Sequence, residues 1–354
     1  MNQNLIFTND IAAALHKCLS GRKFNKLFVI TDHNTERLVL PRLDHCAWLK
    51  NATNISIPAG DASKNLDSLA YVWQKLGEGG GTRHSIVVNL GGGVVTDLGG
   101  FAAATFKRGI PFINVPTTLL SAVDAAVGGK TGINFGGLKN EIGAFCEATD
   151  VIISTVLFST LPQEELNSGF AEMIKHALLK GEYAYSKLLN FNINEHRDDH
   201  DALLALLKES VEVKAEIVAQ DPHEKGIRRA LNLGHTVGHA FESLALSRQK
   251  PIPHGYAVAW GMVVEIILSN FQKKFSGEEV SRFGKFIRDI YGAFHITCND
   301  YDQLLAFMQH DKKSHAGEIN CTLLSAPGEI HIDQTISPAD MQSALDIYRD
   351  IMGI

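Results

Sequence analysis

Short apolar runs alternate with helical patterns over the first 155 residues. Five runs rich in Val, Ile and Leu predict strands, at 27–31, 55–57, 85–90, 112–115 and 151–154. Apolar side chains recur at helical spacing from Leu66 to Leu76, which predicts a helix that ends before Gly77. Such alternation is typical of an α/β domain with a largely parallel sheet, whose ligands bind beyond the carboxyl ends of the strands.

The pattern changes after about residue 155, where the apolar positions recur mainly at helical spacing. Helices are predicted at 164–180, 202–220, 230–246, 255–271, 277–291 and 338–352. Two short runs at 321–324 and 329–332, joined by Ala326-Pro-Gly328, predict one hairpin. We therefore expect an α/β domain over residues 1–155 and a mainly α-helical domain over residues 156–354.

Composition narrows the class of protein. The 354 residues, 45% of them hydrophobic, suffice for two cores, and a net charge of -6 argues against a general nucleic-acid binder. The N-terminus lacks the pattern of a secretory signal, and the most apolar run, 257–269, is interrupted by Glu265 and too short to span a bilayer. The five cysteines are scattered without a CxxC pair. We expect a cytoplasmic protein with reduced thiols and no membrane anchor.

Charged side chains are concentrated in one otherwise small and apolar stretch, Gly91–Asn140. It opens with three glycines directly after a predicted strand, and backbone N–H groups in such a turn can bind an anion. The stretch then supplies cations, carboxylates and hydroxyls: Lys107, Arg108, Lys130, Lys139, Asp97, Asp124, Thr117 and Thr118. The glycines alone fit a simple tight turn, since they form neither GxGxxG nor a P-loop. Together with the charges they predict the floor of an active site for a small anionic ligand.

Histidines and carboxylates of the second half suggest a metal site. Glu172, His235 and His254 would give two imidazoles and one carboxylate, which is the ligand set of a catalytic zinc with an open position. On spacing alone His235 and His239 are the better pair, because residues four apart share one helix face. With 15 histidines in the chain, spacing does not decide between these sets, and each histidine alone fits a core or surface position.

Several lysines lie in segments with few other charges. Lysine is usually a solvated surface residue. Lys130, between Gly128-Gly129 and Thr131-Gly132, is hard to explain in that way. Lys175 follows Glu172 by three residues, so one helix face would present a metal ligand and a cation together.

These motifs make the chain resemble a known family, the 3-dehydroquinate synthases, which belong to the sugar-phosphate cyclases. The similarity runs from about residue 25 to 325. The matching motifs are Gly91–Asp97, Arg108-Gly109, Pro116–Leu120, Val123–Lys130, Lys139–Gly143, Thr160–Pro162, Gly169–Lys175, Asp221–Ala240, His254-Gly255 and Asp311–Lys313.

The resemblance implies a function and its site residues. Catalytic NAD and a divalent metal, zinc or cobalt, would serve the conversion of 3-deoxy-D-arabino-heptulosonate 7-phosphate to 3-dehydroquinate and phosphate in the shikimate pathway. The metal would be held by Glu172, His235 and His254, with His239 beside it. NAD would meet Asp32, Asn34, Asp61, Lys64, Gly92, Gly93, Asp97, Thr117, Thr118, Leu120, Lys130, Lys139, Leu157, Phe158, Ser159 and Thr160. The substrate would meet Arg108, Asp124, Lys130, Lys139, Asn140, Lys175, Lys214, Arg228, Asn232, His239, Lys312 and Lys313.

The same resemblance implies a homodimer that acts on a small molecule and binds no nucleic acid. Alternatives are another sugar-phosphate cyclase or a metal- and NAD-dependent polyol dehydrogenase. Three positions depart from the family pattern: Thr96 and Tyr256 replace a usual Gly and Glu, and Asp61 replaces a usual Glu. Thr96 is expected to restrict the glycine turn.

Overall fold

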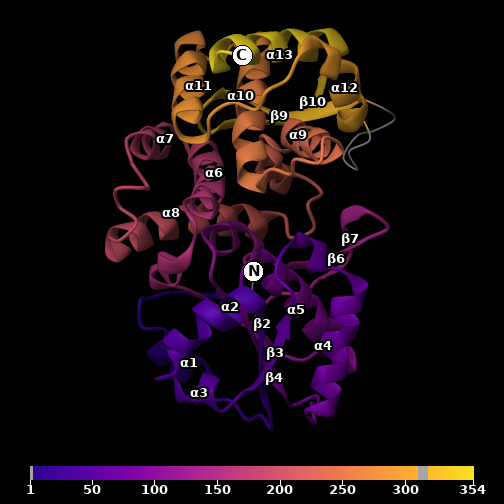
Figure 1. Ribbon diagram of the computed structural model, residues 1–354. Helices are drawn as coiled ribbons and strands as arrows, with labels where there is room; N and C mark the ends of the chain where they lie inside the picture. The colour runs from indigo at the N-terminus through magenta and orange to yellow at the C-terminus, as the bar shows by residue number, and fades with distance from the viewer. Residues whose placement is uncertain (1–2, 310–317) are drawn as a thin grey trace. The chain divides into compact units, whose positions relative to one another are not determined.

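The structure is a computed structural model that describes residues 3–309 and 318–354 (Figure 1). Its Cα positions group into two compact units. Unit 1 comprises Met1–Pro162 and Asn194–Ala215, and unit 2 comprises Gln163–Ile193 and Glu216–Ile354. The segment 194–215 thus groups with the first unit although it follows the start of the second along the chain.

Unit 1 is built on a six-stranded parallel sheet with the order β1-β8-β5-β4-β2-β3. Its strands are β1 (Asn4–Phe7), β2 (Leu27–Asp32), β3 (Thr53–Ile57), β4 (Ile86–Gly91), β5 (Phe112–Pro116) and β8 (Asp150–Ile153). The strands β4, β5 and β8 are buried along their whole length. Continuous apolar runs are what a parallel sheet covered on both faces requires, so the predicted α/β class is confirmed.

The strand order reverses between β2 and β4. From β2 the chain moves outward to β3, then returns to the other side of β2 to form β4, followed by β5 and β8. This reversal is a topological switch point, where the carboxyl ends of neighbouring strands leave a crevice for ligands. The residues at this place are Asp32, at the end of β2, and Gly91, at the end of β4.

Helices and a hairpin complete unit 1. The helices are α1 (Ile11–Leu19), α2 (His33–Leu38), α3 (Ala47–Lys50), α4 (Leu66–Glu78) and α5 (Gly93–Thr105), and α8 (His200–Gln220) begins in this unit. The helix α5 lies tightly on the sheet, because a Cβ at Gly99 would come within 2.1 Å of the Asn89 side chain. The strands β6 (Lys130–Phe135) and β7 (Leu138–Phe145) form a separate antiparallel hairpin.

Unit 2 is mainly helical, as predicted. It contains α6 (Gln163–Lys180), α7 (Glu182–Leu189), α9 (His235–Ser247), α10 (His254–Lys273), α11 (Gly277–Tyr291), α12 (Tyr301–Gln309), α13 (Pro338–Met352) and the hairpin β9 (Ile319–Ala326) with β10 (Glu329–Ile336). The helix α10 is buried at Gly255 and from Ala257 to Ser269, and it contacts α6, α9, α11, α13 and β9 (Figure 1). It is therefore the core element of this unit.

One helix boundary differs from the prediction. The segment expected to be helical from residue 230 contains a short 3₁₀ turn, Ile227–Asn232, and α9 begins only at His235. The reason is Gly234, whose left-handed backbone (φ +80°) interrupts the helical path. Among the residues the structure describes, no helix is both long and apolar enough to cross a membrane.

Candidate active site

Three helices of unit 2 bring a carboxylate and two imidazoles together. Glu172 lies in the middle of α6, His235 is the first residue of α9 and His254 is the first residue of α10. The Nε2 atoms of His235 and His254 lie 3.7 and 3.8 Å from Oε1 of Glu172. These distances exceed a hydrogen bond. They are close to the separation of roughly 3.3–3.6 Å between two ligands of one tetrahedral ion with bonds of about 2.0–2.2 Å.

Hydrogen bonding around Glu172 also fits a cation. The carboxylate is fully buried, and its Oε2 accepts a hydrogen bond from the Lys175 ammonium. Its Oε1 accepts none from the residues the structure describes. A buried carboxylate oxygen in that state is costly unless a cation completes its surroundings. Two imidazoles and one carboxylate are a donor set that suits zinc or cobalt.

The alternative histidine pair is less well placed for that carboxylate. The His239 ring centroid lies 5.4 Å from that of His235, so the two residues do share one face of α9. However, the ligand atoms of His239 group with those of Glu242 and His254, all within 4.8 Å, and not with those of Glu172. His239 therefore lies beside the Glu172–His235–His254 cluster, as the resemblance implies.

Close helix packing holds this cluster in place. A Cβ at Gly255 would lie 1.9 Å from the backbone oxygen of Ser168, and the Gly255 N–H donates to Ser168 Oγ at 3.0 Å. The start of α10 is thereby pressed against α6, which carries Glu172. The Gly234 N–H donates to Oε2 of the buried Glu265 at 2.7 Å, which fixes the turn before His235. Sequence reasoning missed Ser168 and Glu265; the one signal was an acid inside the apolar run 257–269.

Other predicted substrate residues of unit 2 are buried or form hydrogen bonds within their own segment. Lys175 and Arg228 are almost fully buried, and the Arg228 guanidinium donates to the Pro222 carbonyl at 2.6 Å. Asn232 Nδ2 donates to Glu224 Oε1 at 3.3 Å, and Glu224 has a left-handed backbone (φ +57°). Such a conformation is uncommon outside glycine and is often maintained at functional sites.

The loop before Arg228 is organised by one carboxylate. Asp221 accepts hydrogen bonds from the backbone N–H groups of Lys225, Gly226 and Arg228 at 2.7–3.1 Å. These three hydrogen bonds, above all the one from the Lys225 N–H, hold the pKa of the Asp221 carboxyl below its usual value.

In unit 1, two lysines are bound to predicted site residues. Lys64 Nζ lies 3.0 Å from Asp97 Oδ2 and 2.5 Å from Asn140 Oδ1, and Lys214 Nζ lies 2.5 Å from Asp124 Oδ1. Burial raises the pKa of the Asp97 carboxyl, and the neighbouring Lys64 ammonium partly offsets this effect. The structure thus connects positions that are more than 30 residues apart in the sequence.

The glycine turn lies at the switch point of the sheet. Gly92 caps α5 without a side-chain hydrogen bond, and the first turn of α5 carries no acid, so its N-terminal dipole suits an anion. A Cβ at Gly92 would lie 3.1 Å from the Thr118 side chain, and the Thr117 N–H donates to the Gly91 carbonyl at 3.0 Å.

Asp32 lies at the end of β2, the strand next to β4 at the switch point. Its carboxylate accepts a hydrogen bond from the Thr35 N–H at 2.8 Å and caps α2, the helix that contains Asn34. This arrangement fits a dinucleotide.

The expectation about Thr96 was wrong. The residue lies in the first turn of α5 rather than in the glycine turn, and its hydroxyl lies 3.2 Å from both the Gly93 carbonyl and Ser121 Oγ. A helical backbone does not require glycine at position 96. The other two departures are also accommodated: Asp61 accepts from Asn134 Nδ2 at 3.2 Å, and the Tyr256 hydroxyl accepts from Asn167 Nδ2 at 3.3 Å.

Lys130 is exposed, although its sequence surroundings argued against a solvated surface position. Lys130 begins β6, and Lys139 and Asn140 lie in β7, all on exposed parts of the hairpin. Arg108 has a left-handed backbone (φ +69°) in the short turn after α5. Leu120 precedes a π-helical turn, and Leu157–Thr160 lie in the 3₁₀ turn Thr155–Thr160. Lys312 and Lys313 lie outside the described residues.

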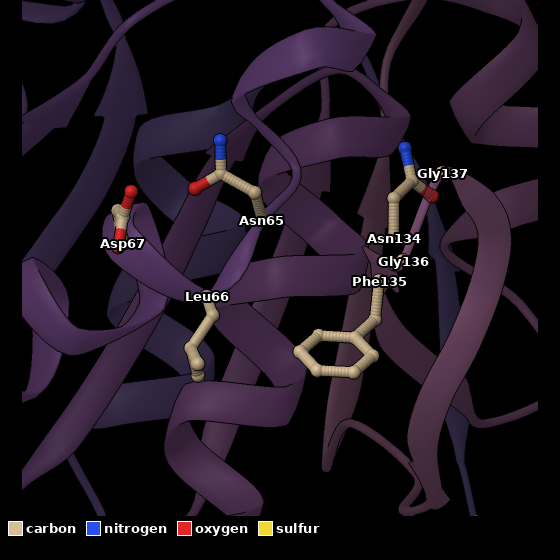
Figure 2. A pocket seen from close by; sticks show the side chains of 7 residues that line it. All are labelled: Asn65, Leu66, Asp67, Asn134, Phe135, Gly136 and Gly137. Carbon is tan, nitrogen blue, oxygen red and sulfur yellow. The ribbon is translucent and has the colours of Figure 1, made fainter.

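Described residues of unit 1 line at least two pockets. One of them, of about 300 Å³, lies between the start of α4 and the β6–β7 turn and is lined by no predicted site residue. Figure 2 shows the side chains that line it, from Asn65, Leu66, Asp67 and 134–137. Another, of about 540 Å³, is lined in part by Leu157 and Ser159, two of the predicted NAD residues, together with Arg42.

Comparison with known proteins agrees with the sequence motifs. Two family models, described as the N-terminal and C-terminal parts of 3-dehydroquinate synthase, match residues 54–168 and 169–314. The chain is 45% identical to the 3-dehydroquinate synthase of Parabacteroides distasonis over 99% of both chains. It is 36% identical to that of Dehalococcoides mccartyi over 91% of this chain and 89% of the relative.

Solved structures share the fold at lower identity. The 2-epi-5-epi-valiolone synthase of Streptomyces hygroscopicus, with NAD+ and Zn2+ bound, superposes with a TM-score of 0.84 at 24% identity, covering 98% of this chain and 97% of that one. A 2-deoxy-scyllo-inosose synthase complexed with carbaglucose-6-phosphate, NAD+ and Co2+ gives 0.82 at 22% identity, covering 96% and 95%. These fold matches agree with the sequence matches. The chain belongs to the 3-dehydroquinate synthase family of enzymes.

Proposed function

We propose that this enzyme converts 3-deoxy-D-arabino-heptulosonate 7-phosphate to 3-dehydroquinate and phosphate, a step of the shikimate pathway. One observation carries the proposal: the buried Glu172 carboxylate faces two imidazoles in a chain that matches a 3-dehydroquinate synthase over 99% of its length. A cytoplasmic location and a homodimeric state belong to the same proposal, by analogy with the family.

Glu172, His235 and His254 would hold the metal, zinc or cobalt. NAD would bind in unit 1 along the carboxyl ends of the strands, where Asp32, Gly92, Gly93 and Thr117 lie. When bound, NAD supplies a hydride acceptor that is regenerated within each turnover, and the metal supplies a Lewis acid. We assign NAD binding mainly to residues 1–155, with Leu157–Thr160 directly after them, and metal binding to residues 156–354.

The remaining site residues would bind a strongly anionic substrate. Its phosphate and carboxylate need cations, and buried cations contribute most because water screens them little. Lys175 and Arg228 are such cations in unit 2. Arg108, Lys130 and Lys139 are more exposed cations of unit 1, and Lys312 and Lys313 complete the set by resemblance. Asp124, held by Lys214, and Asn140, held by Lys64, can accept hydrogen bonds from substrate hydroxyls.

His239 is our candidate for moving a proton. An imidazole can hold or release a proton near neutral pH, and this ring lies next to the cluster, 6.0 Å from the His254 ring. Oxidation of the substrate hydroxyl releases one proton, which a residue at this position can take up. Lys175, bonded to Glu172, adds positive charge at the same place.

A coupled assay tests the proposal. Purified protein is given zinc, NAD and the heptulosonate phosphate, and phosphate and dehydroquinate are measured together. We expect equal amounts of both products, and none from the Glu172→Gln variant. Steady accumulation of NADH without phosphate would mean a polyol dehydrogenase. Equal turnover of a heptulose phosphate that lacks the carboxylate would mean another sugar-phosphate cyclase.

A further inference from the structure

We infer that Glu242 is a positioning residue that fixes the orientation and tautomer of His254. Glu242 lies on α9 seven residues after His235, so both residues share the helix face that carries the cluster. Its Oε2 lies 3.4 Å from Nδ1 of His254, and its side chain is only 12% exposed. The sequence motifs pointed to His235, His239 and His254 but not to this carboxylate.

The His254 ring lies between two carboxylates. Its Nδ1 faces Glu242 Oε2, while its Nε2 faces Glu172 Oε1 at 3.8 Å. A neutral imidazole has one N–H and one lone pair, and an ionised carboxylate only accepts. Glu242 therefore stabilises the proton on Nδ1, which leaves Nε2 as the nitrogen that can bind a metal beside Glu172.

His235 achieves the same orientation in another way. Its Nδ1 lies 3.2 Å from the backbone carbonyl of Leu233, and its Nε2 faces the same Glu172 oxygen. The His254 side chain is 28% exposed and that of His235 only 12%, so His254 has the greater freedom to rotate toward solvent. A charged acceptor gives a stronger hydrogen bond than a backbone carbonyl. His254, the more exposed of the two histidines, thus has the charged acceptor, Glu242.

Glu242 could instead bind an ion directly, because its oxygen lies within 4.8 Å of ligand atoms of His239 and His254. The geometry favours the positioning role. A second ion shared by His254 would require metal on both ring nitrogens and hence a deprotonated ring. A hydrogen bond from Nδ1 to Glu242 needs only the neutral ring. The two roles differ in the number of ions bound.

Zinc binding to Glu242→Ala and Glu242→Gln tests the inference, which rests on the proposed metal site. Affinity and stoichiometry are measured by competition with a chromogenic chelator on otherwise unmodified protein. We expect one zinc per chain throughout, and a 10- to 100-fold lower affinity in Glu242→Ala. Glu242→Gln should lose less, because its amide oxygen still accepts the Nδ1 hydrogen bond. Glu278→Gln, an exposed acid at the start of α11, is the matched control and should bind zinc like the parent.

Imidazole ¹⁵N spectra of the metal-free protein report the tautomer of His254, which general destabilisation of the fold would not change. The parent and Glu242→Gln should show His254 protonated on Nδ1, and Glu242→Ala should show a mixture of tautomers. Unchanged affinity and tautomer in Glu242→Ala would overturn the inference while leaving the metal site intact. Two ions in the parent and one in Glu242→Ala would make Glu242 a ligand instead. A parent chain that binds no zinc would overturn both the inference and the proposed metal site.

Discussion

Buried charge marks the candidate site at the level of single residues. Glu172 and Lys175 are fully or almost fully buried on one turn of α6, although charged side chains are rarely buried without partners. Sequence alone predicted that they share a helix face. It could not predict that Glu172 faces His235 and His254, because those contacts join segments more than 60 residues apart. Glu242 was not predicted, because an acid three residues after His239 also fits a solvated helix face.

Replacement of Glu172 should abolish metal binding. Glu172→Gln keeps the shape of the side chain but removes its charge, so we expect zinc affinity to fall at least about 100-fold. Calorimetric titration of the metal-free protein measures this effect. Glu164→Gln, on an exposed position in the first turn of the same helix, should retain the parent affinity. Equal affinity in the two variants would exclude Glu172 as a ligand.

Asp221 should contribute stability that depends on pH. Its three N–H donors lower its pKa in the folded chain, so its contribution is present above the unfolded value of about 3.8 and is lost as pH falls through the folded pKa. Asp221→Asn has one acceptor oxygen in place of two. It should be less stable than the parent at pH 7, and the difference should shrink below about pH 3.8. Urea titrations at several pH values measure it; a difference independent of pH would contradict this account.

At the scale of helices and strands, glycines decide how closely the site elements approach. The buried strands of unit 1 were predictable because a parallel sheet needs continuous apolar runs, as at 86–90 and 112–115. The hairpin β6–β7 was not predicted, since its strands mix glycines, charges and exposed apolar residues. The start of α9 was placed too early because nothing local revealed the left-handed backbone of Gly234.

A methyl group at Gly255 should separate α10 from α6. The added Cβ would lie 1.9 Å from the Ser168 backbone oxygen, which cannot move without shifting α6. We expect Gly255→Ala to lower the free energy of unfolding by about 1–3 kcal/mol. Zinc affinity should fall as well, because His254 adjoins Gly255. Gly277→Ala, where the nearest atom lies 3.8 Å away, is the control for both measurements. If Gly255→Ala were destabilised but bound zinc like the parent, the close contact between α10 and α6 would not be what positions His254.

At the scale of the whole molecule, the chain comprises two compact units with different chemistry. Unit 1 carries the glycine turn at the switch point of its sheet, and unit 2 carries the Glu172–His235–His254 cluster. Composition and periodicity were enough to predict an α/β part and a helical part. The grouping of residues 194–215 with unit 1 could not be predicted, because their pattern is that of any amphipathic helix.

Metal removal should loosen unit 2 selectively. A ligand present at 100 times its dissociation constant stabilises the folded state by about 2.7 kcal/mol. Chelation should therefore accelerate amide hydrogen exchange in α6, α9 and α10, the helices that carry the proposed ligands Glu172, His235 and His254. The strands β2, β4 and β5 should keep their exchange rates. Exchange that accelerates equally in both units, or in neither, would contradict the assignment of the metal to unit 2.

We expect the enzyme to close a carbocycle while regenerating its own NAD. The most direct measurement supplies one equivalent of NAD per enzyme chain and a hundredfold excess of the heptulosonate phosphate, with phosphate, dehydroquinate and NADH followed together. We expect many equivalents of phosphate and dehydroquinate in equal amounts, without net NADH. Arrest after a single equivalent of product, with the nicotinamide left reduced, would contradict it.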